Sequence, residues 1–280
     1  MAKKVVGGGG GRGRKASLEH AQSCTQNEMT TEGRPRLLDL FCGAGGAAMG
    51  YAEAGFDVIG VDIKPQPNYP FLFVQADAMW EMDMVNGGAG LADMPLNGEF
   101  LTFSSFDVIH ASPPCQAYIQ RNKNLETKHP KLIEPMRTKL DRWLSQVAYH
   151  YPGKPVAYVI ENVLQEVLVE PVMLCGTFFG LSLRRHRYFE VSPPLLMSTP
   201  CNHWGTVAAD NFAAVYAYGG KGHRHGAGVR DAAPAPAKVT WEEAMGIDWM
   251  TKTELSQAIP PAYTRYIGRQ LMALMKFQKG

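Results

Sequence analysis

The sequence lacks several features that would point to other classes of protein. No uninterrupted apolar run reaches the roughly 18 residues that a membrane helix needs, and no apolar segment follows the basic residues at the start. The five cysteines are odd in number and have no repeated short spacing, which disfavours a secreted disulfide framework. Internal repeats are absent as well. We therefore expect a cytoplasmic protein with free thiols and no membrane association.

The sequence also lacks an excess of charge of one sign, since its net charge over 280 residues is only +2. Such a balance says little about nucleic-acid binding, which depends on where the charge is concentrated. With 45% hydrophobic residues, the chain has enough apolar side chains for one large core, with or without a small appended lobe. Largely disordered and fibrous classes are thereby excluded.

The first 33 residues are rich in glycine and basic side chains and have little that would pack into a core. We expect residues 1–33 to form a disordered tail. A solvated tail or a cloning remnant is the preferred interpretation, and an arm that contacts nucleic acid is the alternative.

From Arg36 onward, short apolar runs alternate with helix-like stretches. Continuous hydrophobicity within the runs indicates strands that are buried on both faces, and apolar residues in the stretches between them have helical spacing. The alternation of strand, helix and strand predicts an α/β fold with a parallel sheet that helices cover on both faces. The expected strands begin at Arg36, Asp57, Phe71, Phe106, Val156 and Arg187.

This alternation fails after Val191, where proline, glycine and histidine become frequent. We expect a cofactor-binding and catalytic domain over residues 34–191 and a small separate lobe over residues 192–240. Residues 241–280 regain helical periodicity in TRYIGRQLMALMKF and should pack back on the main domain.

A glycine-rich turn, DLFCGAGG, follows the first expected strand and opens a helix. Gly43 and Gly45 allow a tight turn and a close approach of a ligand to the backbone. The spacing differs from a dinucleotide fingerprint, and no Lys-Ser or Lys-Thr pair is present for a triphosphate. We expect Asp39 and the turn to contact a nucleotide-like cofactor, with the Phe41 ring against a purine.

Acidic side chains follow the next two expected strands at the same edge of the sheet. Asp62 lies about 20 residues after the turn, where a carboxylate can accept hydrogen bonds from both ribose hydroxyls. Asp77 is placed to meet an adenine amino group, and Ile63 and Ala78 come directly after the two acids. Each acid alone suits a cap at a strand end. Together with the turn they predict an adenosine ligand, because this edge is where open α/β sheets bind ligands.

Cys115 follows the strand that begins at Phe106, in the loop SPPCQ. A lone cysteine is usually a small buried hydrophobic residue, but two prolines stiffen this loop and its neighbours are polar. Glu161 comes at the end of another strand and should reach the same edge, where burial would raise the pKa of its carboxyl group. A thiol and a carboxyl group at one edge indicate a catalytic site.

The segment RRHRYFEV carries Arg185 and Arg187 at alternate positions, so both should point to one face and Arg184 and His186 to the other. Two guanidinium groups on one face can hold a carbonyl oxygen and a phosphate. For the arginines alone, a solvated edge strand is the preferred interpretation.

Taken in order, DLFCGAGG, SPPCQ, IENV and RRHR resemble the ordered motifs of the cytosine-5 DNA methyltransferase family. The resemblance covers roughly residues 36–191 and the C-terminal end. It implies a Rossmann-like methyltransferase sheet that binds S-adenosylmethionine, a small target-recognition lobe, and a cytosine flipped out of double-stranded DNA. A compact chain of this kind suits a phage or prophage, a phage-infected host or a bacterial restriction-modification system. We expect it to act as a monomer.

The resemblance also implies a role for each matched residue. Cys115 would attack carbon 6 of the cytosine ring as a thiolate. Glu161 would hydrogen-bond the N3 edge and supply a proton. Arg187 would hold the O2 atom, Arg185 would support the loop, and Gln116 would contact DNA.

Two positions depart from the family pattern. In LSQAIPP, Ser256 and Gln257 stand where the family has Gly and Asn, although Ala258 fits and should still wall the methionine end of the cofactor. Leu183 stands where the family usually has Gln. We expect altered backbone freedom at the first position and weaker support of the active-site loop at the second.

The lobe is short but carries more basic than acidic residues. Its glycine-rich loop over residues 219–230 should contact DNA through phosphates or a groove, using Lys221, Arg224 and Arg230. A rival interpretation makes a zinc site of Cys201, His203, His223 and His225, but their spacing matches no standard zinc finger. A basic loop without metal is preferred.

Two other functions stay open from the sequence. A tRNA cytosine-5 methyltransferase also carries the SPPCQ loop, although the Cys-Phe-Thr tripeptide of that branch is absent. A catalytically silent DNA-binding relic would explain the altered C-terminal motif, but Cys115 and Glu161 argue against it. An amino-group methyltransferase is disfavoured because the thiol-bearing loop replaces its usual Asp-Pro-Pro-Tyr type of loop.

Overall fold

The computed structural model describes residues 33–87, 95–96, 99–118, 130–163, 165–197, 200–201 and 241–277. These residues form a seven-stranded sheet in the order β3-β2-β1-β6-β7-β9-β8. Its strands are β1 (Arg36–Leu40), β2 (Asp57–Asp62), β3 (Leu72–Gln75), β6 (Val108–Ala111), β7 (Ala157–Asn162), β8 (Val172–Cys175) and β9 (His186–Ser192). Pro95–Leu96 (β4) and Glu99–Phe100 (β5) pair separately. The predicted α/β, Rossmann-like fold is confirmed.

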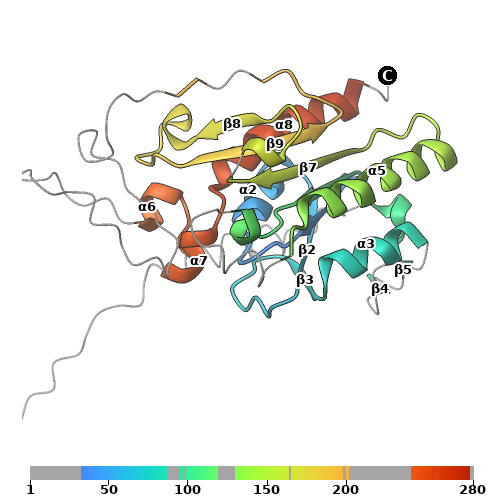
Figure 1. The fold of residues 1–280 in the computed structure, drawn as a ribbon, viewed down its shortest axis with the longest axis horizontal. Coiled ribbons are helices and arrows are strands. Elements are labelled where there is room, and N and C mark those ends of the chain that lie inside the picture. The colour runs from blue at the N-terminus through green and yellow to red at the C-terminus, as the bar shows by residue number, and fades with distance from the viewer. Residues whose placement is uncertain are drawn as a thin grey trace, which may run out of the picture.

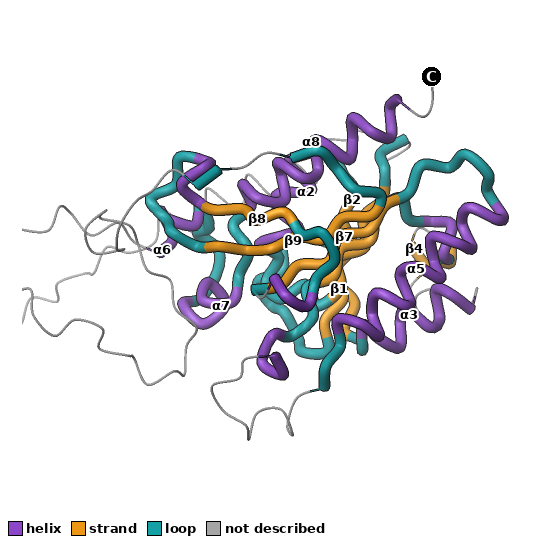
Figure 2. The backbone as a smooth tube through the Cα atoms, turned by 45° about the horizontal axis from the view of Figure 1, so that its top comes forward, coloured by secondary structure: helices purple, strands orange, loops and turns teal. Residues whose placement is uncertain are grey.

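Helices cover the sheet on both faces, as the sequence pattern predicts. On one face α2 (Gly46–Ala54) lies against α8 (Pro261–Phe277), and on the other α3 (Ala78–Gly87) lies beside α5 (Ile133–His150), as Figures 1 and 2 show. Alternate residues of β1 supply the two cores, since Leu37 belongs to the core under α2 and α8 while Leu38 and Leu40 belong to the other. This is why the strands read as continuous apolar runs.

The packing of α2 on α8 depends on small residues. A Cβ atom added to Gly50 would lie 2.1 Å from the carbonyl oxygen of Pro261, and one added to Gly268 would lie 2.7 Å from the Cβ of Ala54. The hydroxyl of Thr264 donates a hydrogen bond to the carbonyl oxygen of Ala47 at 2.8 Å. The two helices therefore approach too closely for larger side chains at these glycines.

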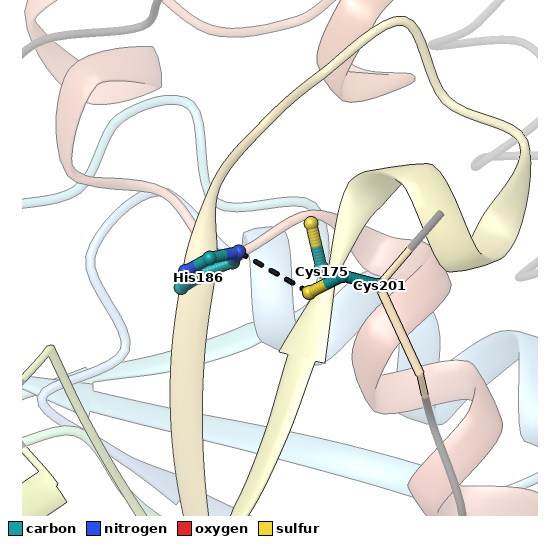
Figure 3. A group of neighbouring side chains, drawn as sticks. All are labelled: Cys175, His186 and Cys201. Carbon is teal, nitrogen blue, oxygen red and sulfur yellow. Dashed lines mark hydrogen bonds between the residues drawn. The ribbon is translucent and has the colours of Figure 1, made fainter. Parts of the chain in front are cut away.

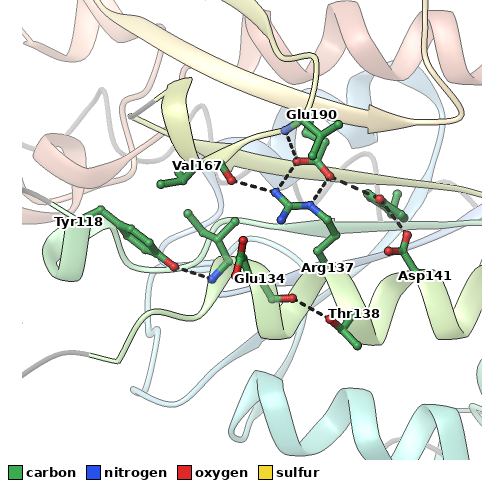
Figure 4. A network of polar contacts seen from close by, with 10 residues as sticks. Tyr118, Glu134, Arg137, Thr138, Asp141, Val167 and Glu190 are labelled. Atoms are coloured by element: carbon green, nitrogen blue, oxygen red, sulfur yellow. Dashed lines mark hydrogen bonds and ion pairs between the residues drawn. The ribbon is translucent and has the colours of Figure 1, made fainter.

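Helix α5 is held to the sheet by a buried ion pair as well as by its apolar stripe. Arg137 donates hydrogen bonds from Nε and Nη2 to the two carboxylate oxygens of Glu190 in β9, each at 2.7 Å, as Figure 4 shows. The backbone amide of Val169 also donates to Glu190. Loss of one partner from such a buried pair typically costs about 3–5 kcal/mol, so this contact fixes α5 against β9, the strand that carries Arg187.

One edge of the sheet departs from the prediction. Strand β9 is antiparallel to both β7 and β8, and β8 was not expected at all. The prediction of strand, helix and strand throughout is therefore wrong after β7. Between β8 and β9 the connection is shorter than the roughly dozen or more residues, usually a helix, that a parallel crossover needs, so these two strands pair as an antiparallel hairpin.

The C-terminal segment begins with two short helices, α6 (Trp241–Met245) and α7 (Lys252–Gln257). Their buried residues form a third apolar cluster that includes Ala44 of the glycine-rich turn. Trp249 donates a hydrogen bond from its indole to the carbonyl oxygen of Ala44 at 2.9 Å. Within the described helices, none is both long and apolar enough for a membrane span. Two proposed regions lie mostly outside the described part of the chain. They are the tail over residues 1–33 and the lobe over residues 192–240.

Candidate active site at the carboxyl edge of the sheet

The glycine-rich turn after β1 has the backbone of a ligand-binding loop. Phe41, Gly43 and Gly45 all have positive φ angles, of 57°, 50° and 85°. Glycine takes this conformation at little cost, whereas Phe41 is strained there. A Cβ atom added to Gly43 would meet nothing within 4 Å, so the space above the turn is open.

Asp62 ties this turn to the end of β2. Its Oδ2 atom accepts a hydrogen bond from the amide of Gly43 at 3.0 Å, and its Oδ1 atom accepts one from the amide of Lys64 at 2.9 Å. Each carboxylate oxygen has a further lone pair for a ligand hydroxyl. Ile63 is 63% exposed beside it, which leaves an apolar surface open at the same edge.

Asp77 has a structural partner at the next strand end. Its Oδ1 atom accepts a hydrogen bond from the amide of Met79 at 2.8 Å, which satisfies one of the unpaired amides at the start of α3. The side chain is exposed, and Ala78 is buried as the first residue of the helix. Asp77 thus caps a helix and still borders the edge at which it was expected.

Asp39 lies deeper than the other predicted cofactor residues. It is 1% exposed, and neither carboxylate oxygen has a hydrogen-bond partner among the described residues. Burial raises the pKa of this carboxyl group, and the charge of Asp62 raises it further. In register it pairs with Gly60 on one side and His110 on the other, so it sits within the sheet and not at its rim.

Cys115 lies in a single 3-10 turn, Cys115–Tyr118, just beyond β6. Its thiol is partly buried, and its pKa is raised first by burial and then by the charge of Glu161. The cations of Arg187 and Arg185 act in the opposite direction and lower the pKa of Cys115. The four predicted catalytic side chains are therefore close enough to act on one another.

Glu161 ends β7 and forms the centre of this group. Its Oε1 atom lies 2.9 Å from Nε of Arg187, and the residue is 6% exposed. Burial raises the pKa of Glu161 above its usual value, although Arg187, Arg185 and a hydrogen bond from Ser112 all lower it. Desolvation thus outweighs the neighbouring cations and favours the protonated acid.

The next residue, Asn162, holds the cysteine loop in place. Its side-chain amide donates a hydrogen bond to the carbonyl oxygen of Pro113 at 3.1 Å, and its Oδ1 atom accepts one from the amide of Val163 at 2.9 Å. Asn162 thus fixes the loop that carries Cys115 beside the strand end that carries Glu161.

A buried polar chain behind Glu161 was missed from the sequence. His110 of β6 accepts or donates at both ring nitrogens, with the hydroxyl of Tyr51 at 3.0 Å and that of Ser112 at 2.8 Å. Burial lowers the pKa of His110 to about 3, so the ring is neutral. A histidine inside the apolar strand FDVIHAS was the only sequence signal for it.

Arg185 is anchored by the segment that departs from the family pattern. Its Nη2 atom donates a hydrogen bond to the carbonyl oxygen of Ser256 at 2.7 Å, and the hydroxyl of Tyr263 donates to the carbonyl oxygen of Arg185 at 2.5 Å. Burial, together with the charge of Arg187, lowers the pKa of Arg185 to about 9. Ser256 makes this contact through its backbone, and its own hydroxyl donates a hydrogen bond to the carbonyl oxygen of Thr253 at 2.7 Å.

The other expected contacts of the C-terminal segment also lie near the turn. A Cβ atom added to Gly46 would lie 3.2 Å from the Cβ of Ala258 and 2.5 Å from the carbonyl oxygen of Ile259. Leu183, where glutamine was expected, is completely buried in the apolar cluster under α6 and α7. A polar side chain at that position would be buried among apolar neighbours.

The proposed DNA contacts are only partly described. Gln116 is exposed, one residue after the cysteine. The remaining predicted contacts and the histidines of the rival zinc site lie outside the described residues: Lys221, Arg224, Arg230, His203, His223 and His225.

Several solved structures are similar to this chain. A candidate DNA modification methyltransferase encoded within an E. coli prophage is 21% identical, with 65% of this chain and 57% of that chain covered and a TM-score of 0.37. DNMT2 of Spodoptera frugiperda is 19% identical, with coverages of 55% and 48% and a TM-score of 0.35. The Entamoeba histolytica methyltransferase EhMeth is 11% identical, with coverages of 88% and 99% and a TM-score of 0.43. The chain thus spans about half the length of the first two.

Comparison with curated proteins gave no significant match. Residues 35–165, however, match the family model of the C-5 cytosine-specific DNA methylases. The matched residues include the glycine-rich turn, Cys115 and Glu161. Over this part of its sequence, a little under half of the chain, the protein is similar to the C-5 cytosine-specific DNA methylases.

Proposed function

We propose that the protein transfers a methyl group to carbon 5 of a cytosine flipped out of double-stranded DNA, through a covalent adduct with Cys115. The observation that carries this proposal is the meeting of Cys115, Glu161, Arg185 and Arg187 at one edge of the sheet. These are the thiol, acid and cations that such an addition needs. They come from separate segments of the chain.

S-adenosylmethionine is the methyl donor of this family, and its sulfonium supplies an electrophilic methyl group. The residues at the turn fit it. Open space lies above Gly43, Asp62 has lone pairs for ribose hydroxyls, and Ile63 offers exposed apolar surface. Phe41, Asp77 and Ala258 would complete the walls of the adenosine and methionine ends.

Cys115 would begin the reaction. Its thiol must lose a proton to a base or to solvent to become the competent nucleophile. Burial and the charge of Glu161 raise the pKa of Cys115, and the charges of Arg187 and Arg185 offset part of that rise. The thiolate then forms a bond from sulfur to carbon 6 of the cytosine, and the ring's π electrons move toward carbon 5 and N3. Carbon 5 becomes electron-rich by this addition.

Glu161 would donate its proton at N3 as negative charge builds up on the ring. The raised pKa of Glu161 keeps that proton available. Arg187 contributes guanidinium N–H groups for the O2 atom while its Nε atom stays on Glu161. Arg185, fixed by Ser256, would keep this arrangement rigid.

Carbon 5 would then take the methyl group, which would leave the sulfonium behind as a neutral thioether, and carbon 5 would lose its own proton to a base. As the bond from sulfur to carbon 6 breaks and the double bond re-forms, Glu161 would take back the proton from N3. Cys115 is thereby restored. The cytosine differs from the starting base only by a methyl group in place of a hydrogen.

Double-stranded DNA is the substrate we propose, because the matched family is defined by DNA cytosine methylation. The exposed Gln116 lies beside the nucleophile, and the basic loop over residues 219–230 would contact the duplex. The proposal also includes that the protein acts as a monomer in a phage or in a bacterial restriction-modification system.

Incubation with tritiated S-adenosylmethionine and either duplex DNA or tRNA tests the substrate. We expect label in DNA cytosine and none in tRNA. Label confined to tRNA would show that the substrate is RNA and not DNA. If the protein binds DNA but labels neither substrate, and calorimetry detects no heat of cofactor binding, it is a catalytically silent relic. The Cys115→Ser variant is the matched control, because it should bind the cofactor and transfer no label.

A further inference from the structure

A second group of reactive side chains lies where β8 and β9 pair, next to the strand position of Arg187. Cys175 of β8, His186 of β9 and Cys201 each place one ligand atom within 4.8 Å of the other two. Figure 3 shows the two sulfur atoms and the imidazole ring pointing toward one another. The proposed reaction uses none of these three side chains.

Strand pairing brings the first two ligands together. Cys175 and His186 are directly opposite each other in the antiparallel pair of β8 and β9, so their side chains leave the same face of the sheet. Cys201 returns to this point after the end of β9, and its Sγ atom lies 3.4 Å from Nε2 of His186. The three ligand atoms are thus brought together by the pairing of β8 with β9 and by the chain that follows β9.

The chemistry of this group matches a zinc site. In a tetrahedral zinc site the metal lies about 2.3 Å from sulfur and 2.0–2.1 Å from nitrogen, which places neighbouring ligand atoms about 3.5–3.8 Å apart. The distances here are within reach of that geometry by small side-chain movements. Two thiolates would also offset the two positive charges of the ion.

The surroundings support a bound metal. Cys175 is completely buried, and the hydroxyl of Thr177 lies 3.3 Å from its Sγ atom. A hydroxyl that hydrogen-bonds a ligating sulfur is the kind of outer partner that orients metal ligands.

We propose that Cys175, His186 and Cys201 bind a zinc ion, with water or another group as the fourth ligand. The ion would join β8 and β9 to the chain at Cys201, just before the segment that leads to residues 202–240. His186 precedes Arg187 directly, so the ion would also hold the start of the strand that carries the arginine. This proposal does not depend on the proposed methyl transfer, and it revises the expectation of a protein without metal.

The test is metal analysis of the full chain without a polyhistidine tag, purified from zinc-supplemented cells. We expect about one zinc per chain and, after replacement by cobalt, a thiolate-to-cobalt charge-transfer band with intense visible bands of tetrahedral Co²⁺. Cys201→Ser and His186→Asn should each lose the zinc. Cys115→Ser should keep it while losing methyl transfer, which separates the two sites.

Two results would overturn the proposal. One is a purified chain that contains no zinc and shows no cobalt bands. The same conclusion follows if Cys201→Ser and His186→Asn keep their zinc while circular dichroism shows that both variants are folded. The other is a Cys175–Cys201 disulfide, detected by mass spectrometry as a linked peptide pair in protein purified without reductant. As a finer test, Thr177→Val should weaken zinc affinity roughly 10–100-fold, and unchanged affinity would count against the oriented thiolate.

Discussion

Nε of Arg187 lies 2.9 Å from Oε1 of Glu161, and the two side chains are only 12% and 8% exposed. A cation this close would ordinarily keep a carboxyl group ionised. Burial has the larger effect here, because the pKa of Glu161 is still raised. The pair therefore holds an acid that a cation orients and whose pKa is still raised, a direction that favours donation of a proton to a cytosine ring.

The same pair should tune the thiol of Cys115 in opposite directions. The charge of Glu161 raises the pKa of Cys115 and that of Arg187 lowers it. Glu161→Gln should therefore move the pH midpoint of Cys115 alkylation by iodoacetamide downward, and Arg187→Gln should move it upward. Peptide-level mass spectrometry over a pH series measures both. Arg187→Lys, which keeps the charge, is the control, and shifts of the same sign in both glutamine variants would contradict this account.

The residues of the site should divide into those that bind the cofactor and those that act on the cytosine. Asp62→Ala removes the acceptor of two backbone amides and of the proposed ribose contacts, so S-adenosylmethionine affinity should fall about 10-fold or more. Glu161→Gln should leave that affinity within a few-fold of wild type and reduce turnover strongly. Calorimetry and turnover measured on the same preparations check this. The reverse pattern would show that the division is wrong.

His110 should make stability depend on pH. Its pKa is lowered from 6.5 to about 3, so the unfolded chain binds this proton more tightly than the folded one. Stability should therefore be full above pH 6.5 and fall as the pH drops toward 3, by up to about 1.4 kcal/mol per pH unit. His110→Gln should show a flatter dependence of unfolding free energy in urea titrations at pH 5 and 7. Parallel slopes for the variant and the wild type would refute a buried neutral histidine.

The loop over residues 219–230 should bind DNA through phosphates. Replacing Lys221, Arg224 and Arg230 together by Ala should weaken DNA binding at low salt and leave S-adenosylmethionine affinity unchanged. For each phosphate that the variant no longer neutralises, the log-log salt slope should fall by about 0.9, whereas removal of a side chain that reads a base should change the methylated sequence. If affinity, slope and sequence all stay the same, the loop is a solvated tip and recognition lies elsewhere in residues 192–240.

Much of the sheet was predictable because buried parallel strands leave a strong signal. Six expected strands are present, and Cys115 and Glu161 lie at their ends as the motif order indicates. Strand β8 was missed because its four residues, VMLC, carry no motif and no alternation with a helix that would mark them as a strand. Without β8, the pairing that places Cys175 opposite His186 could not be foreseen.

The finer contacts of the site depend on backbone atoms and long-range neighbours. The carbonyl oxygen of Ser256 that holds Arg185 is offered by every residue type, so no motif marks it. The role of His110 could not be predicted from the sequence, because its partner Tyr51 lies 59 residues away in the chain and meets it only in the folded structure. Asp77 lies after β3, at the position where it was expected. The sequence alone could not tell whether its carboxylate caps the following helix, as it does here, or also binds a ligand.

Trapping with duplex DNA that contains 5-fluorocytosine tests the central claim most directly. The fluorine at carbon 5 cannot leave as a proton does, so the bond from Cys115 to carbon 6 should persist after methyl transfer. We expect a shifted band on denaturing gels that requires S-adenosylmethionine, is absent for Cys115→Ser, and yields a Cys115 peptide carrying the methylated fluorinated base. An enzyme that methylates ordinary DNA at full rate but forms no such adduct, or a Cys115→Ser variant with near-wild-type turnover, would contradict the account.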